Sequence, residues 1–178
     1  LDEFEILMLY ILSNTYSDTA EEAYDLGMFI GLAALGEAEA RNLKWQDINW
    51  ETQRIKIKRV KTDTDFEIPI YKWLKPHLLD LFYRSGQPKV GHVFKLRTIK
   101  RSLKSACEAL GFDLFTPRNL RQMGIVRQLD VGLKPKIVAK YQGHQDGGIL
   151  IMSTYSEVIN RDEDKNLNSI LLNLGVVD

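Results

Sequence analysis

The segment Gln53–Val60, with the sequence QRIKIKRV, is where the periodicity of the chain changes. Ile55 and Ile57 alternate with basic residues, which is the period expected of a strand with one buried face. Residues 61–65 have the composition of a turn, and residues 66–71 (FEIPIY) return as a second strand. Pro69 cannot donate a ladder hydrogen bond, so we expect this second strand at a sheet edge. The stretch predicts a small antiparallel hairpin.

The segments on both sides of this hairpin have helical patterns. Thr116 and Pro117 form a helix start, because threonine is a good N-cap and proline fits the first turn. Gly111 and Gly132 are typical of helix ends. The patterns predict helices over residues 1–13, 20–35, 37–43, 71–83, 99–110, 117–130 and 135–142, a short one leading to Tyr155, and a last one over 157–174. The predicted fold class is α+β, mainly helical, with a small antiparallel β-element.

Composition narrows the class of protein further. The chain has 178 residues, 44% of them hydrophobic and 27% charged, as expected of a soluble globular protein. Its single cysteine, Cys107, excludes an internal disulfide framework and a cysteine-based zinc site. No apolar run approaches the roughly 20 residues of a membrane span, and no signal peptide is evident, so we expect a cytoplasmic protein without membrane contact. The opening Leu1 suggests a fragment of a longer chain.

Charge is unevenly distributed along the chain. The formal net charge is zero, but residues 51–140 hold 20 bases and 8 acids (+12), whereas residues 1–50 hold 2 bases and 10 acids (−8) and residues 141–178 hold 2 bases and 6 acids (−4). Such a chain can present one strongly basic, concave face to a polyanion. Charge alone leaves a second interpretation open, a helical protein with solvated lysines.

Four stretches occur together and in order: residues 37–48 (EAEARNLKWQDI), the basic hairpin with Lys61-Thr62, residues 116–121 (TPRNLR), and Gly143-His144 followed by Tyr155. In this arrangement the chain resembles the catalytic domain of the tyrosine recombinases, or phage integrase family. The resemblance covers nearly the whole chain and implies that family's mainly helical α+β fold.

The resemblance implies that Tyr155 is the nucleophile. Its phenolate would attack a DNA phosphate and form a 3′-phosphotyrosyl bond with a free 5′-hydroxyl. The aryl phosphodiester preserves the energy of the broken bond, so rejoining needs neither ATP nor a ligase. The resemblance implies no cofactor and no metal. Tyr10 and Tyr141 are rival tyrosines, but neither has a Gly-His element at a suitable distance upstream.

The same resemblance assigns further catalytic roles. Arg121 matches the second catalytic arginine, and Arg118 lies on the same helix face, so both could hold one phosphate. At the position of Arg118 the family usually has histidine or lysine. Lys61 would be the general acid, and a surrounding of like charges should ease release of its proton. His144 would hydrogen-bond the phosphate, and its interval to Tyr155 is a couple of residues longer than usual, with Gly147-Gly148 as the expected insertion. Basic residues expected to contact DNA are Arg54, Lys56, Lys58, Arg59, Lys95, Arg97, Lys100 and Arg101.

One position departs from the family pattern. The first catalytic arginine lies three residues before the acid matched by Glu39, and this position is Gly36. An arginine on a transferring phosphoryl group contributes on the order of 10³–10⁵ in rate. Three hypotheses therefore stay open: an active recombinase, a catalytically impaired DNA-binding protein on the same fold, and an unrelated helical interaction domain.

We expect residues 1–160 to form the catalytic domain and residues 161–178 a helical tail. The tail carries Leu167, Ile170, Leu171 and Leu174 at helical spacing. An apolar stripe there predicts docking onto a neighbouring protomer, as in related recombinases, or onto its own domain. Double-stranded DNA and self-assembly on DNA are the expected partners. Native roles in integration, excision, resolution and transposition all remain compatible with the sequence.

Overall fold

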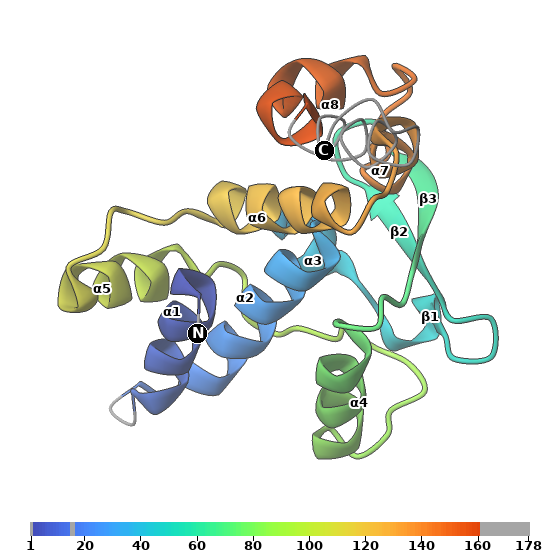
Figure 1. Ribbon diagram of the computed structural model, residues 1–178. Helices are drawn as coiled ribbons and strands as arrows, with labels where there is room; N and C mark the ends of the chain where they lie inside the picture. Colours follow the sequence, from blue (N-terminus) through green and yellow to red (C-terminus); the bar gives the residue numbers. More distant parts are fainter. Residues whose placement is uncertain (1, 15–16, 161–178) are drawn as a thin grey trace, which may run out of the picture. The chain divides into compact units, whose positions relative to one another are not determined.

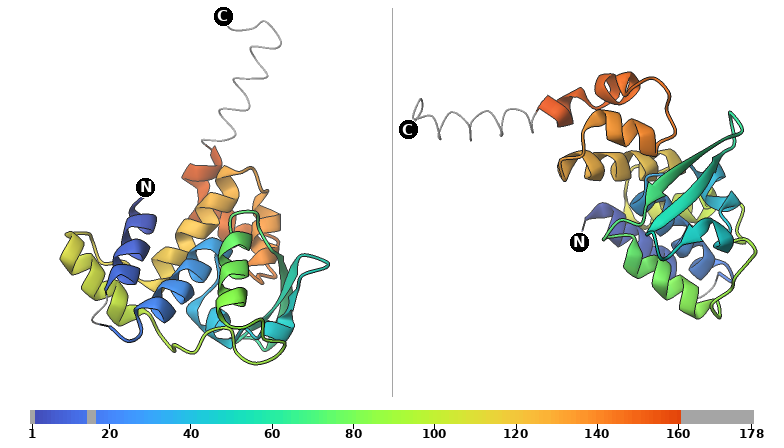
Figure 2. Two further views of the ribbon diagram at one scale, coloured as in Figure 1. Left: turned by 90° about the horizontal axis from the view of Figure 1, so that it is seen from below. Right: turned by 90° about the vertical axis from the view of Figure 1, so that its right-hand side faces the viewer.

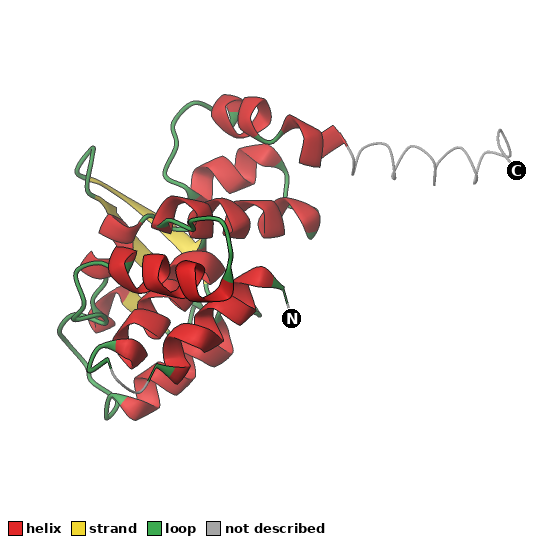
Figure 3. Ribbon diagram, turned by 90° about the vertical axis from the view of Figure 1, so that its left-hand side faces the viewer, coloured by secondary structure: helices red, strands yellow, loops and turns green. Residues whose placement is uncertain are grey.

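The computed structural model describes residues 2–14 and 17–160. The described residues divide into two compact units, one up to residue 124 and one from residue 125 onward. Figure 1 shows the order of their elements along the chain. Helices make up most of the described chain, with one small sheet in the first unit (Figure 3). This confirms the mainly helical α+β class.

The first unit is built around helix α2 (Ala20–Ala33). Helices α1 (Glu3–Ser13), α3 (Glu37–Asn42) and α4 (Lys75–Arg84) each pack against α2, and α5 (Lys100–Leu110) packs against α1. The helix predicted over residues 20–35 is therefore confirmed, and it lies at the centre of the first unit. Its Leu26, Phe29 and Ile30 are completely buried, so α2 supplies much of the hydrophobic core.

Two glycines allow α1 to approach α2 closely. A Cβ atom on Gly31 would lie 2.6 Å from two ring carbons of Phe4, and one on Gly27 would lie 2.6 Å from the sulfur of Met8. Phe4 and Met8 are fully buried there. The ring and the thioether occupy the space that side chains at these helix positions would need.

The sheet has three antiparallel strands in the order β1 (Ile48–Asn49), β2 (Arg54–Arg59) and β3 (Thr64–Pro69) (Figure 2). Ile55 pairs with Ile68 and Ile57 with Phe66, so the alternating isoleucines of β2 face the core as predicted. Strand β3 lies at the edge, which confirms the position inferred from Pro69. The two-residue strand β1 was not predicted, because so short a segment has no readable period.

Helix α4 begins later than predicted, at Lys75 and not at residue 71. Residues 71–74 form a turn in which the Leu74 N–H donates to the carbonyl of Tyr71 over 3.0 Å. The rings of Tyr71 and Trp73 stack with centroids 4.9 Å apart, and the Trp73 indole N–H donates to the Leu32 carbonyl over 2.9 Å. These aromatic anchors, with Pro76 in the first turn, set the start of the helix.

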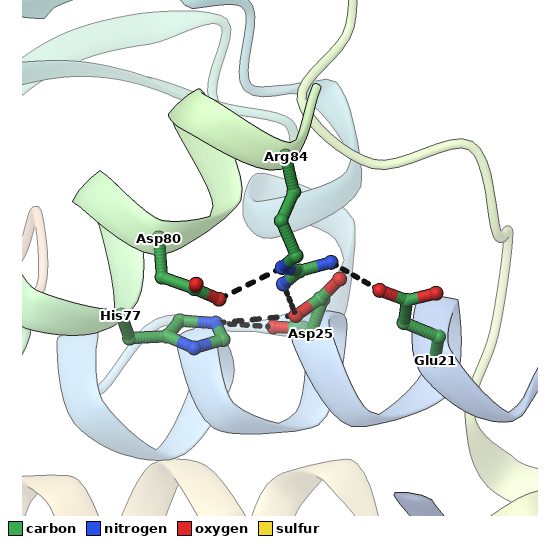
Figure 4. Close-up of polar contacts among 5 residues, drawn as sticks. All are labelled: Glu21, Asp25, His77, Asp80 and Arg84. Carbon is green, nitrogen blue, oxygen red and sulfur yellow. Dashed lines mark hydrogen bonds and ion pairs between the residues drawn. The ribbon is translucent and has the colours of Figure 1, made fainter. Parts of the chain in front are cut away.

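A polar cluster joins α2 to α4 (Figure 4). The Arg84 guanidinium contacts the carboxylates of Asp25 and Asp80, each over 2.8 Å, and that of Glu21. The His77 Nε2–H lies 3.1 Å from the Asp25 carbonyl, which can accept from it. Burial lowers the pKa of His77 and raises the pKa of Asp25, the latter opposed by its hydrogen bond to Arg84. The buried carboxylate of Asp25 thus has a cationic partner in Arg84, which offsets the cost of removing the carboxylate from water.

The second unit contains α7 (Pro135–Tyr141) and α8 (Ile149–Thr154), which pack together, and residues 156–160 are helical. Helix α6 (Pro117–Asp130) runs from the first unit into the second and ends before Gly132, as predicted. Gly148 takes a φ of 102°, and a Cβ atom there would lie 3.1 Å from the backbone of Lys136. A glycine is therefore required at this contact. The predicted tail, residues 161–178, lies outside the described residues.

Candidate active site

Helix α6 carries both candidate arginines in its first turns. Thr116 and Asn119 cap it reciprocally: the Asn119 N–H lies 3.3 Å from the Thr116 hydroxyl, and the Thr116 N–H lies 3.0 Å from the Asn119 side-chain oxygen. This confirms the predicted helix start. Arg118 is exposed and Arg121 is half-buried. Both lie near the positive end of the helix dipole, where an anion would be stabilised.

Gly124 brings α6 against the end of α2. A Cβ atom on Gly124 would collide with the carbonyl oxygen of Gly31 and lie 2.8 Å from Cα of Ala34. Both neighbours are backbone atoms that cannot move aside. Arg121 lies three positions earlier on the same helix face, so this approach sets the position of its side chain.

Arg121 is placed beside Gly36. A Cβ atom on Gly36 would lie 3.7 Å from Nη1 of Arg121 and would collide with a carboxylate oxygen of Glu39. Gly36 is the N-cap of α3, so the Glu39 carboxylate bends back over the first turn of that helix. The position that lacks the expected arginine is thus flanked by a carboxylate and by the second arginine. A guanidinium there would have an acceptor at hand.

Lys61 lies in the exposed loop, residues 60–63, that joins the last paired residues of β2 and β3. Two of the lysines on the neighbouring strand, Lys56 and Lys58, are each paired with a carboxylate. The Lys56 ammonium lies 2.8 Å from Asp65, and the Lys58 ammonium lies 2.8 Å from Asp63. Hydrogen bonds to these carboxylates raise the pKa of both lysines and, for Asp63, lower the pKa of the acid. Sequence reasoning missed this because a register is needed to tell which charges meet.

His144 and Tyr155 belong to the second unit. The backbone N–H of His144 donates to the Ala139 carbonyl over 2.9 Å, which holds the Gly-His element against the end of α7. Tyr155 is the C-cap of α8, and its N–H donates to the Ile151 carbonyl over 3.0 Å. Both residues are half-buried. Of the five candidate catalytic residues, Lys61, Arg118 and Arg121 lie in the first unit and these two in the second.

Asp146 organises the interval between His144 and Tyr155, and sequence reasoning missed it. Its carboxylate accepts the N–H of Gly148 over 2.9 Å and that of Leu150 over 3.1 Å, at the start of α8. These backbone hydrogen bonds lower the pKa of Asp146. The signal was present, since Asp-Gly-Gly before an apolar run is typical of a turn followed by a helix. Gly147 and Gly148 both have positive φ, 67° and 102°, consistent with a loop that needs glycine.

Two adjoining grooves on the first unit carry many of the predicted DNA-contacting side chains. The hairpin groove, about 570 Å³, includes Lys56 and Lys58 in its lining, and the neighbouring groove, about 510 Å³, includes Lys95 and Arg97. Asn42 and His92 line both.

Exposed basic residues missed by sequence reasoning are Arg41 and Lys44. Of the other predicted contacts, Arg54 is exposed and Arg59 half-buried on β2, and Lys100 and Arg101 are exposed in the first turn of α5.

Within the described residues, no group of three or more histidine, cysteine, aspartate or glutamate side chains could hold a metal ion. The helices of that part of the chain include none long and apolar enough to cross a membrane.

The phage integrase family model matches residues 1–160. The chain belongs to the phage integrase family. No curated protein matches it by sequence. The match includes all four stretches from which the resemblance was inferred.

Solved structures of integrase-family proteins share this fold. The XerA recombinase is 17% identical, with a TM-score of 0.65 and coverage of 97% of this chain and 64% of XerA. The Tn1549 transposon integrase, in complex with transposon right end DNA, is 16% identical, with a TM-score of 0.67. The match covers 92% of this chain and 64% of the Tn1549 integrase. The lambda integrase catalytic core is 18% identical, with a TM-score of 0.62. The match covers 80% of this chain and 92% of the lambda integrase core. The chain thus spans 64% of the first two proteins and nearly all of the third.

Proposed function

We propose that this chain is the catalytic region of a site-specific DNA recombinase that breaks and rejoins DNA through Tyr155. The observation that carries the proposal is membership of the phage integrase family over residues 1–160, a range that contains Lys61, Arg118, Arg121, His144 and Tyr155 in the family's order. The position of Arg121 beside Gly36, next to Glu39, supports the register of the first and third of the four sequence stretches.

In the proposed reaction the Tyr155 hydroxyl gives its proton to solvent water and its oxygen bonds to a DNA phosphorus. The bond from that phosphorus to the 5′-oxygen breaks, and the departing oxygen takes a proton from the Lys61 ammonium. The products are a 3′-phosphotyrosyl bond and a 5′-hydroxyl. Rejoining is the reverse reaction, with a 5′-hydroxyl as the nucleophile and Tyr155 as the leaving group, so neither step consumes ATP. The proposed mechanism uses side chains alone, with no cofactor or metal.

Arg118 and Arg121 would hold the non-bridging oxygens of this phosphate, and His144 would donate to the same group. Charge on those oxygens increases as the fifth bond to phosphorus forms. Fixed donors therefore bind the transition state more strongly than the ground state. With Gly36 at the first arginine position, Arg118 takes over part of that role.

Double-stranded DNA is the proposed substrate. The Tn1549 integrase and the XerH recombinase were both solved with DNA. The exposed basic residues around the two grooves of this chain give its first unit a comparable polyanion-binding chemistry.

Self-assembly on DNA through residues 161–178 and a cytoplasmic location are further parts of the proposal. Sedimentation on DNA should then distinguish the full chain from one that ends at Asn160.

A second candidate function is DNA binding without cleavage, and Gly36 is the observation that favours it. Both functions predict binding to DNA whose affinity falls steeply with salt. Only the recombinase predicts a covalent protein–DNA product.

A pool of duplexes with randomised sequence, each carrying a nick, tests the proposal. Cleavage beside a nick releases a short fragment and traps the covalent product, which survives denaturing electrophoresis. We expect the chain to form an adduct with part of the pool and Tyr155→Phe to form none while it binds DNA as well as the parent. Binding without any adduct would favour the second function, and no binding would overturn both.

A further inference from the structure

The hairpin groove and its neighbour differ sharply in charge. The neighbouring groove is lined by the cations Arg41, Lys95 and Arg97 and by no carboxylate. The hairpin groove has as many cations, Lys44, Lys56 and Lys58, but also the carboxylates Asp47, Asp63 and Asp65. Two adjoining surfaces with the same number of cations therefore present different fields to DNA, one positive and one balanced.

The balance in the hairpin groove comes from direct pairing. Lys56 and Lys58 each have a carboxylate oxygen 2.8 Å from the ammonium, in Asp65 and Asp63. All four side chains are exposed, from 49% for Asp65 to 81% for Asp63. The carboxylates thus occupy positions that phosphate oxygens would take on the same two lysines.

The backbone keeps Asp63 in this place. It has a φ of 52°, in the left-handed region that aspartate and asparagine tolerate better than most residues. Next to it, the hydroxyls of Thr62 and Thr64 lie 2.7 Å apart. In the strand register, Lys58 lies opposite Asp65 and Lys56 lies opposite Glu67. Each of these two basic residues of β2 therefore faces an acidic residue of β3.

We propose that Asp63 and Asp65 compete with DNA phosphates for Lys58 and Lys56, and so restrain the contribution of the hairpin to DNA binding. The proposal deepens the DNA-binding part of the proposed function and rests on it. The neighbouring groove, with its unopposed cations, supplies the sequence-independent attraction. The hairpin lysines engage DNA only where a phosphate is placed well enough to displace a carboxylate.

The energies are suited to such competition. An ion pair between exposed side chains is weak, because water and salt screen it, so a phosphate can displace the carboxylate. Each displaced pair nevertheless subtracts from the gain in DNA affinity. The restraint weakens binding wherever the phosphates are poorly placed for these lysines, and so lowers the background of unspecific binding relative to binding at a well-fitting site.

Charge-removing substitutions test the proposal in the full chain, with a fluorescent duplex of mixed sequence as the probe. We expect Asp63→Asn and Asp65→Asn each to tighten binding by about two- to fivefold, the range that corresponds to one exposed ion pair. Asparagine tolerates the left-handed backbone of position 63, so folding should be unaffected. The matched control is Glu51→Gln, an equal change of net charge at the opposite end of β2, which should tighten binding less than twofold.

A double-mutant cycle separates competition from a general charge effect. If Asp63 restrains Lys58, then Lys58→Gln should weaken binding more in the Asp63→Asn background than in the parent chain. Equal losses in both backgrounds, or equal gains for Glu51→Gln and the two aspartate variants, would overturn the proposal while leaving DNA binding intact. Failure of the parent chain to bind DNA at all would instead overturn the proposed function.

Discussion

Gly36 is the residue at which this chain departs from the family pattern of catalytic arginines. Its backbone, at φ −72° and ψ 154°, is in the extended region that arginine adopts readily. An added side chain would first meet the carboxylate of Glu39, the mobile end of a flexible side chain. The site can therefore accept an arginine if that carboxylate turns outward and pairs with it.

We predict that Gly36→Arg folds normally and speeds formation of the covalent adduct by about 10- to 1,000-fold, less than a fully evolved arginine contributes. Single-turnover kinetics on the nicked duplexes selected by the parent chain would measure this. Gly36→Gln is the matched control, because it adds bulk without charge. Equal rates for both variants would show that the missing arginine does not limit the reaction.

At the scale of elements, the approach of α6 to α2 determines where Arg121 lies. Gly124→Ala should force the helices apart, because its methyl group meets the backbone of Gly31 and Ala34. We expect the free energy of unfolding to fall by about 1–3 kcal/mol and adduct formation to slow as Arg121 is displaced.

Gly27→Ala is the matched control for this prediction. It is also a glycine in a helix interior, but its new methyl group meets the thioether of Met8, which can shift. Its better helix propensity offsets the contact by up to about 1 kcal/mol. Chemical denaturation of the two variants would compare them, and equal loss of stability would contradict the assigned role of Gly124.

The α2–α4 cluster should make stability dependent on pH. Burial lowers the pKa of His77 in the folded state, so below the unfolded value of 6.5 the unfolded chain binds the extra proton more readily. Stability is then lost as pH falls below that unfolded value. His77→Gln keeps an N–H for the Asp25 carbonyl and removes the titration, so it should flatten this part of the profile. Denaturation midpoints measured at several pH values would check this, and an unchanged slope would contradict it.

At the scale of the whole molecule, the sequence predicted what depends on periodicity and chain order. The isoleucine alternation of β2, the edge position of Pro69 and the Thr116 cap were all confirmed. The late start of α4 could not be predicted, because the Trp73 bond to Leu32 joins segments far apart in sequence. Pairing of Lys58 with Asp63 depends on where the turn directs its side chains, which composition does not encode.

The assignment of catalytic roles depends on whether Tyr155 carries the DNA. After nuclease trimming of the adduct, tandem mass spectrometry of the peptides would locate the residual nucleotide. We predict that it lies on Tyr155, because this is the only tyrosine that follows the Gly143-His144 element in the sequence. A nucleotide on Tyr141 or on any other side chain would contradict the account.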